Sequence, residues 1–335
     1  MQDVDAMNAS LRAFSEGLID YAGLFPPAGL DMQPAITNFL DYRAGAFQQQ
    51  LGSFVIPAAR LSELDATASP LAIHAQQWGA VPFSVLAGGG SDTAVFHQNM
   101  DTALKQVEGF LDVHGHNVRV SAFEIRLPDV LPDAEALPKE LTQLIKTVHA
   151  QLDTDPDFFF ELKRDASWPE NVGRLTGALA SVSGPFAPAL IGFKLRCGGV
   201  KAEMFPSVAE VACAIHSCVH ADVPLKATAG LHHPVRHFNA GVQTRMHGYF
   251  NVFGAIMLAK VHGWNPSKIE EMLADEHAAH FIFDVEGFAW KHFRADLPQI
   301  RAYRAGLATS YGSCSFAEPL EDLHTLGLLS AHPQL

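Results

Sequence analysis

The sequence lacks the features that mark secreted and membrane-spanning proteins. Its four cysteines form no CxxC pair, so we expect reduced thiols and a cytoplasmic location rather than a disulfide scaffold. No stretch approaches the roughly 18 apolar residues that a membrane-spanning helix needs. The N-terminus has no basic region followed by an apolar run. We therefore expect neither a membrane span nor a secretory signal.

Positive charge is also scarce. Lysine and arginine together number 23 against 36 aspartates and glutamates, which gives a formal net charge of -13. Because nucleic-acid binding depends on basic side chains that neutralise phosphates, this balance argues against a nucleic-acid partner. No internal repeat or domain boundary is visible, so we predict a single domain over residues 1–335.

What the sequence does contain is a regular alternation of strand-like and helix-like segments. Such alternation is typical of a parallel α/β fold. The strand-like runs are LIDYAGLF, GSFVIP, VPFSVLAGGG, VRVSAFEIRLP, DFFFELKR, ALIGFKLR, VPLKATAG and YGSCSF. Eight strands would close a (β/α)8 barrel of the TIM type, with its active site at the carboxyl ends of the strands. We favour the barrel over an open doubly wound sheet, because no GxGxxG motif follows the first strand.

The segment from about 264 to 309 interrupts this rhythm before the last strand. Asn265 and Pro266 are a capping residue and a first helical residue, and HFIFDVEGFAWKHF predicts a hairpin turned at Val285–Gly287. We therefore predict an inserted helix–hairpin segment. The very apolar helix predicted for 246–261 would permit a subunit interface in a homo-oligomer.

Four consecutive predicted strands end in charged residues. The pairs are Glu124 with Arg126, Glu161 with Lys163, Lys194 with Arg196, and Lys226 with Thr228. Because side chains alternate along a strand, both members of a pair share a face. Burying charge costs several kcal/mol unless the charge is paired, so we interpret the set as a functional site. The alternative is a set of salt bridges that plugs the barrel, for example Glu161 with Lys194.

Lys194 and Lys226 lie on strands joined by one amphipathic helix. A strand–helix–strand unit of this length predicts neighbouring parallel strands, about 4.8 Å apart. Two ammonium groups held close together lower each other's pKa, and a lysine with a lowered pKa is the usual Schiff-base nucleophile. We therefore expect Lys194 and Lys226 to be catalytic, with Glu161 or Glu124 moving protons.

Cations outnumber carboxylates in this predicted set, which suggests an anionic substrate such as a carboxylate or phosphate. Arginines can bind a carboxylate through two hydrogen bonds, and glycines let the backbone approach an anion. We assign substrate binding to Arg126, Lys163, Arg196, Gly198, Gly199, Thr228, Gly230 and Arg236.

A histidine-rich loop, GLHHPVRHFNAG, follows the seventh predicted strand. His232 and His233 can relay protons near neutral pH, can bind a divalent metal together with Glu124 or Glu161, or can form loop hydrogen bonds. We assign no metal ligand and no cofactor beyond this alternative. Cys314 has no evident base nearby in the sequence, so we expect a buried thiol.

The motifs KLRCGG and KATAGLHHP resemble the sixth and seventh strands of the deoxyribose-phosphate aldolase type of class I aldolase barrel. The resemblance implies that Lys194 forms the Schiff base and Lys226 tunes it. The catalytic aspartate of that family has no clear match here, and two histidines replace its phosphate-binding turn. Over most of its length the sequence also resembles a set of uncharacterised bacterial proteins that carry FKLRxGG, KATAGLHHPxR and GSCSFxEP.

Three functional hypotheses follow. The first is an aldolase-like or lyase-like enzyme that acts on a small anionic carbonyl compound through a Schiff base. The second is a divalent-metal-dependent barrel lyase or hydrolase that uses Glu124, Glu161, His232 and His233. The third is a barrel that binds an anionic metabolite without chemistry.

Overall fold

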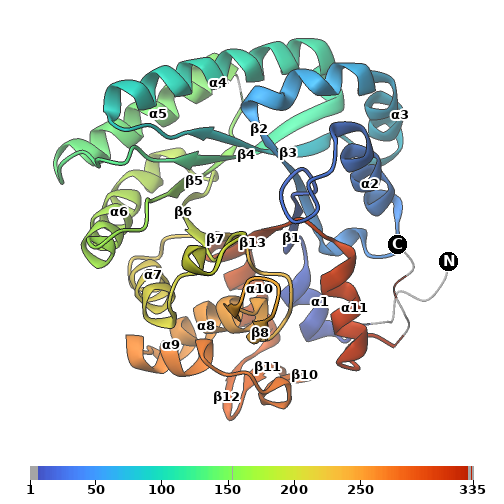
Figure 1. Cartoon of the computed structure of the whole chain (residues 1–335), viewed down its shortest axis with the longest axis vertical. Coiled ribbons are helices and arrows are strands. Elements are labelled where there is room, and N and C mark those ends of the chain that lie inside the picture. Colours follow the sequence, from blue (N-terminus) through green and yellow to red (C-terminus); the bar gives the residue numbers. More distant parts are fainter. Residues whose placement is uncertain (1–6, 153, 331–332, 334–335) are drawn as a thin grey trace. The chain divides into compact units, whose positions relative to one another are not determined.

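A computed structural model describes residues 7–152, 154–330 and 333 of the chain. Eight strands form a closed barrel in the order β1-β13-β7-β6-β5-β4-β3-β2 (Figure 1). The barrel strands are β1 (Ile19–Tyr21), β2 (Leu51–Pro57), β3 (Val81–Gly88), β4 (Val118–Arg126), β5 (Asp157–Glu161), β6 (Ile191–Arg196), β7 (Leu225–Thr228) and β13 (Ala308–Ser313). The predicted (β/α)8 fold is confirmed.

Helices alternate with these strands. They are α1 (Ala9–Ser15), α2 (Met32–Ala44), α3 (Ala68–Trp78), α4 (Thr93–His114), α5 (Ala136–Leu152), α6 (Trp168–Ser183), α7 (Val208–His220), α8 (Tyr249–His262) and α11 (Ala317–Thr325). A 3-10 helix over Ala58–Thr67 follows β2. Within the described residues, no helix combines the length and the apolar character that crossing a membrane requires.

The contacts divide the chain into two compact units. The Lys194 unit comprises Leu30–Leu40 and Ser53–Lys194. The Lys226 unit comprises the residues up to Gly29, Asp41–Gly52 and the residues from Leu195 onward. A single domain over the whole chain stays a prediction.

In the Lys194 unit, parallel register brings the charged strand ends into line. Arg126 of β4 pairs with Glu161 of β5, and Glu161 pairs with Lys194 of β6. The long amphipathic helix α4 covers β3 and β4, and Figure 1 shows it beside α5. Asp92 caps α4 by accepting a hydrogen bond of 3.0 Å from the backbone N–H of Val95. The helix therefore begins directly after the glycine loop that ends β3.

In the Lys226 unit, a capping box fixes the start of α7, the helix between the two lysine-bearing strands. The backbone N–H of Ser207 donates to Glu210, and the backbone N–H of Glu210 donates to Ser207 Oγ. Strand β7 follows β6 in the barrel order, as the crossover predicts. At the ends of these strands the backbone N–H of Cys197 donates to the carbonyl of Thr228 at 2.8 Å.

The inserted segment contains α9 (Pro266–Leu273), the antiparallel sheet β10 (Phe281–Asp284), β11 (Gly287–Trp290) and β12 (Phe293–Ala295), and α10 (Leu297–Gly306). Asp284 pairs with Gly287, which places the hairpin turn at Val285 and Glu286 as predicted. Figure 1 shows this sheet close to α1, which contacts β10 and β11.

Helix α8 differs from the interface helix that its composition suggested. Every residue from Tyr249 to Ala259 is buried within the chain. The helix is covered by α7, α9, β12, α10 and β13. Its apolar surface is therefore used for intramolecular packing.

Candidate active site

Lys194 lies in a buried cluster with two carboxylates in the Lys194 unit. Its Nζ atom is 2.7 Å from Oε2 of Glu161 and 3.0 Å from Oε2 of Glu124. The side chain of Lys194 is only 3% exposed, so its ammonium group depends on these carboxylates rather than on water. The three predicted residues lie together, and the contact between Lys194 and Glu161 is the salt bridge that the plugged-barrel alternative named.

Ser84 of β3 extends the cluster to a fourth strand. Its hydroxyl donates a hydrogen bond of 2.7 Å to Oε1 of Glu124, and both side chains are buried. A donor of this kind favours the ionised form of the carboxylate. Ser84 was not predicted, although a serine within an apolar strand is a detectable signal.

The expected lowering of the lysine pKa is wrong for Lys194. Burial lowers this pKa, but the negative charges of Glu161 and Glu124 outweigh burial, so the net shift is upward. The predicted shift took account only of the repulsion from Lys226, although Glu161 was already a possible salt-bridge partner of Lys194. The contacts with two carboxylates reverse the direction of the shift.

Lys226 forms a second buried cluster, in the Lys226 unit. Its ammonium group donates to Asp20 of β1 and to Oγ of Ser310 of β13, the latter at 3.0 Å. Ser310 in turn donates to Asp20 Oδ2 at 2.5 Å. Asp20 and Ser310 were not predicted. An aspartate inside the apolar run LIDYAGLF was the available signal for Asp20.

Three other predicted cations, Arg126, Lys163 and Arg196, lie nearer the surface. Arg126 Nη2 is 3.0 Å from Asp129 Oδ1, and Lys163 Nζ is 2.9 Å from Asp129 Oδ2. The hydrogen bond from Lys163, with that from Arg126, lowers the pKa of Asp129. Arg196 is exposed at the end of β6. The predicted surplus of positive charge did not account for Asp129, which pairs with Arg126 and Lys163, or for Asp20, which pairs with Lys226.

The glycines assigned to anion binding allow close side-chain packing instead. A Cβ atom on Gly198 would lie 2.5 Å from the ring of Phe205, and one on Gly199 would lie 2.6 Å from Met204. Gly230 has φ +71°, and a Cβ there would lie 2.9 Å from the Cα of Gly198. The space beside Gly198 and Gly199 is therefore filled by Phe205 and Met204.

The histidines of the loop after β7 contact acidic residues of α11. His232 Nδ1 is 3.0 Å from Glu318 Oε2 and 3.9 Å from Cys314 Sγ, and His233 Nδ1 is 2.6 Å from Asp322 Oδ2. Burial lowers the pKa of His232, but Cys314 and Glu318 outweigh burial and raise it to about 9. The hydrogen bond that His233 donates to Asp322 raises the pKa of His233. Cys314 is buried as expected, and its contact with His232 was not visible in the sequence.

Arg236 belongs to a structural network in the same loop, which also carries the short hairpin of β8 (His237–Asn239) and β9 (Thr244–Met246). The guanidinium of Arg236 lies 3.2 Å from Nδ1 of the fully buried His247, whose Nε2 contacts the carbonyl of Pro206 at 2.8 Å. Burial lowers the pKa of His247 to about 4. At neutral pH His247 is therefore an uncharged ring that donates to Pro206 and accepts from Arg236.

The four residues of the predicted metal alternative do not form a ligand cluster. Over residues 7–152, 154–330 and 333, one group of three histidine, cysteine or carboxylate residues has its ligand atoms within 4.8 Å of one another, and it comprises Asp275, His277 and His280. Glu124 and Glu161 contact Lys194 instead. The geometry therefore does not favour a metal-dependent mechanism at the predicted residues.

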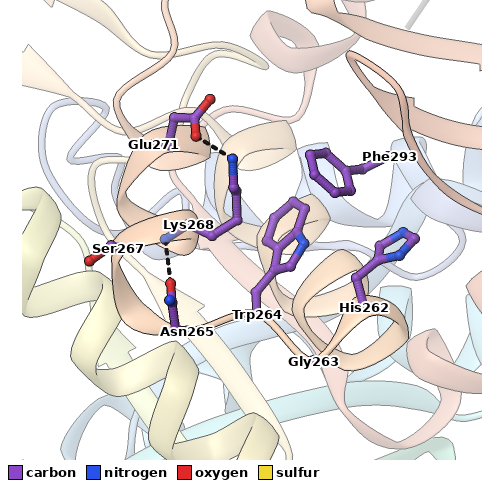
Figure 2. Close-up of a pocket in the computed structure, with 8 residues that line it drawn as sticks. All are labelled: His262, Gly263, Trp264, Asn265, Ser267, Lys268, Glu271 and Phe293. Carbon is purple, nitrogen blue, oxygen red and sulfur yellow. Dashed lines mark hydrogen bonds and ion pairs between the residues drawn. The ribbon is translucent and has the colours of Figure 1, made fainter.

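An open pocket of about 560 Å³ lies on the inserted segment. Figure 2 shows its aromatic residues Trp264, Phe293 and His262 beside Lys268, whose ammonium group pairs with Glu271. No residue of the two lysine clusters lines this pocket.

No family model matches the sequence, and no curated protein gives a significant match.

Proposed function

We propose that the protein is a barrel enzyme that forms a Schiff base between Lys194 and a small anionic carbonyl compound, with chemistry of the aldolase or lyase class. The observation that carries the proposal is the 2.7 Å contact between Lys194 Nζ and Glu161 Oε2 inside a buried cluster. The (β/α)8 fold supports an enzyme in general, because barrels of this type hold their active sites at the carboxyl ends of the strands. The resemblance of KLRCGG and KATAG to class I aldolases supports the same class.

A single proton transfer within the Lys194–Glu161 ion pair produces the two groups that imine formation requires. Transfer of a proton from the Lys194 ammonium to Glu161 yields a neutral amine and a carboxylic acid. The amine attacks the carbonyl carbon, and its nitrogen loses a proton as the carbonyl oxygen gains one. Glu161 then protonates the resulting hydroxyl group, which leaves as water while the nitrogen lone pair completes the iminium.

Glu124 would serve as the constant counter-charge in this sequence. Its carboxylate accepts a hydrogen bond from Ser84 and lies 3.0 Å from Lys194 Nζ. The nitrogen is cationic both as the resting ammonium and as the iminium, so the same carboxylate stabilises both states. Glu161 returns to its ionised form when water leaves. It can then accept a proton from the substrate carbon next to the iminium.

The raised pKa of Lys194 opposes attack by the free amine, so the proposed reaction depends on a proton acceptor beside the lysine. Because the ammonium is the dominant resting form, Lys194 cannot act alone as a nucleophile at neutral pH. The reaction needs a proton acceptor in direct contact with the lysine. Glu161 meets that requirement.

Surface charge near the cluster supports an anionic substrate. Arg126 and Lys163 share one carboxylate, Asp129, so these three residues carry a formal surplus of one positive charge. Both cationic side chains are roughly half exposed. They can therefore bind a carboxylate or phosphate group on an incoming carbonyl compound.

Borohydride trapping tests the proposal. The protein is incubated with a panel of small keto acids, aldehydes and sugar phosphates, reduced with borohydride, digested and analysed by mass spectrometry. We expect a covalent adduct on Lys194 with at least one compound that is also turned over. The Lys194→Arg variant retains a positive charge beside the two carboxylates and should give no adduct.

Lys105→Gln is the matched control, because Lys105 is an exposed lysine on α4. This variant should give the same adduct as the unmodified protein. A compound that is turned over without any adduct on Lys194 would exclude the Schiff base. Saturable binding of anions without turnover or adduct would instead support a metabolite-binding protein.

A further inference from the structure

Asp275, His277 and His280 form a compact cluster between the end of α9 and the start of β10. His277 Nδ1 lies 3.2 Å from Asp275 Oδ1, and His280 Nδ1 lies 2.7 Å from Asp275 Oδ2. The two imidazole rings are 5.1 Å apart between centroids. One carboxylate therefore faces two imidazole nitrogens at the same time.

The carboxylate is held in place by donors other than the histidines. Trp290 Nε1 of β11 donates to Asp275 Oδ2 at 2.9 Å, and the backbone N–H of His277 donates to Oδ1 at 2.9 Å. Asp275 is buried although His277 is 77% exposed. The cluster thus combines a fixed oxygen ligand with an imidazole that is open to solvent.

The backbone around Asp275 is fixed as well. The fully buried amide of Asn251 on α8 donates to the carbonyls of Met272 and Asp275 at 2.8 and 2.9 Å. Its Oδ1 accepts from the backbone N–H of Arg236 at 2.9 Å. These bonds tie the backbone at Asp275 to α8.

We propose that Asp275, His277 and His280 bind a divalent transition-metal ion of the zinc, cobalt or nickel type. Two imidazole nitrogens and one carboxylate oxygen are donors that such ions prefer, and Trp290 supplies the outer hydrogen bond that orients the carboxylate. For bonds of about 2.0–2.1 Å, ligand atoms around a tetrahedral ion lie about 3.4 Å apart. The 3.2 Å contact is to Oδ1 of Asp275 and the 2.7 Å contact is to Oδ2, so a carboxylate that binds the ion through one oxygen must turn slightly while the rings shift outward.

Lys291 is the cationic group that opposes metal binding. Its Nζ atom is 3.9 Å from Asp275 Oδ2. The same atom is 3.1 Å from Glu271 Oε1 and 4.4 Å from the centroid of the Trp290 ring. Lys291 therefore lies closer to Glu271 than to Asp275. The ion would reach the site from the solvent-exposed side of His277.

The ion would connect the end of α9 to the loop that enters the β10–β12 sheet. None of its ligands belongs to the Lys194 or Lys226 cluster. The proposal is therefore independent of the Schiff-base chemistry and gives the ion a structural role within the inserted segment.

Tryptophan fluorescence provides a direct test. Trp290 contacts Asp275, and its ring lies 5.7 Å from that of Trp264, which Figure 2 shows at the neighbouring pocket. Untagged, metal-stripped protein is titrated with Co²⁺ and with Ni²⁺, both of which quench nearby indole emission. We expect saturable quenching that reaches its plateau at one equivalent.

Variants locate the binding site. His277→Ala and His280→Ala should each weaken binding at least about tenfold, and the double variant should abolish stoichiometric quenching. His292→Ala is the matched control, because His292 is an exposed histidine in the turn between β11 and β12 and should leave the affinity unchanged. Circular dichroism of each variant checks the fold.

The stacked pair His216 and His220 on α7 is the competing site. Binding that disappears in the His216→Ala/His220→Ala variant and persists in the His277→Ala/His280→Ala variant would overturn the proposal. The absence of saturable quenching with both ions would overturn it as well.

Discussion

The Oε2 atom of Glu161 lies 2.7 Å from Nζ of Lys194, and the two residues are paired across β5 and β6. This contact combines a candidate nucleophile and a candidate proton acceptor in one buried pair. It also stabilises the resting state, because each charge offsets the burial of the other. The same two atoms therefore determine both a catalytic and a stability prediction.

Replacing Glu161 with glutamine should slow imine formation. The amide keeps the shape of the side chain but cannot accept the proton of Lys194 or protonate the leaving hydroxyl. We expect the rate of adduct formation to fall about 10²–10⁴-fold. Single-turnover trapping with borohydride measures this rate. Glu140→Gln, at a partly exposed position on α5, is the control, and equal rates in both variants would contradict the assigned role.

Replacing Lys194 with methionine should destabilise the fold. The substitution leaves two buried carboxylates without their cation, and loss of one partner of a buried ion pair costs about 3–5 kcal/mol. Urea unfolding followed by circular dichroism gives the free energy of unfolding. Lys105→Met, on the exposed face of α4, should stay within about 0.5 kcal/mol of the unmodified protein. A Lys194→Met variant as stable as this control would show that the ion pairs contribute little.

His232 should make the stability of the protein depend on pH. Its folded-state pKa of about 9 lies above the ordinary histidine value of about 6.5, so the charged form is favoured by folding. This contribution is fully present below pH 6.5 and is lost as pH rises through 9. Its size is at most about 3 kcal/mol, and solvent screening lowers it because Glu318 is 42% exposed.

The measurement compares unfolding free energies of the unmodified protein and His232→Gln at pH 6 and pH 9.5. The unmodified protein should lose more stability over this interval. The difference between the two proteins isolates His232 from His233, whose pKa is also raised. Parallel pH profiles would contradict the prediction.

Gly230→Ala should lower the free energy of unfolding more than a glycine-to-alanine substitution at a position that has similar backbone strain but open space around the added Cβ. Gly230 has φ +71°, and the added Cβ would lie 2.9 Å from Gly198 Cα and from the Phe205 ring. Strain of about 1–2 kcal/mol and overpacking of about 1–3 kcal/mol both apply. Gly263 has φ +63° and nothing within 4 Å of the added Cβ, so Gly263→Ala should show the strain alone. Equal losses of unfolding free energy would contradict the packing argument.

The fold was predictable because its signals are local. Apolar runs with period two alternate with helical periodicity along the chain, and parallel strands joined by helices leave few possible topologies. The hairpin at Val285 and Glu286 was predictable for the same reason, since strand-like segments flank a turn that ends at Gly287. These features depend on neighbouring residues rather than on distant ones.

The candidate site was predictable only in part, because its electrostatics depend on residues far apart in the sequence. Lys226 contacts Asp20, which lies 206 positions away. Alternation identifies which side chains share a strand face, but it does not identify which carboxylate lies opposite which lysine. The direction of the Lys194 pKa shift follows from those pairings, and it was therefore predicted incorrectly.

The cluster at Asp275 was missed for a different reason. Its spacing, Asp-x-His-x-x-His, is visible in the sequence as DEHAAH. The sequence prediction instead chose His232 and His233 of the loop after β7 as the candidate metal ligands. In the structure these histidines pair with Glu318 and Asp322. The number of histidines does not distinguish a histidine–carboxylate pair from a set of metal ligands. At Asp275 the carboxylate is fixed by a hydrogen bond from Trp290, and the sequence does not show this bond.

Helix α8 sets a lower limit on how far this chain can be shortened. A helix that is apolar on every side must be enclosed, and here α9, α10 and β12 of the inserted segment provide much of the enclosure. A trimmed barrel without residues 264–306 would expose this helix to water and should aggregate. Attempts to engineer a minimal version must therefore redesign α8 before removing the segment that covers it.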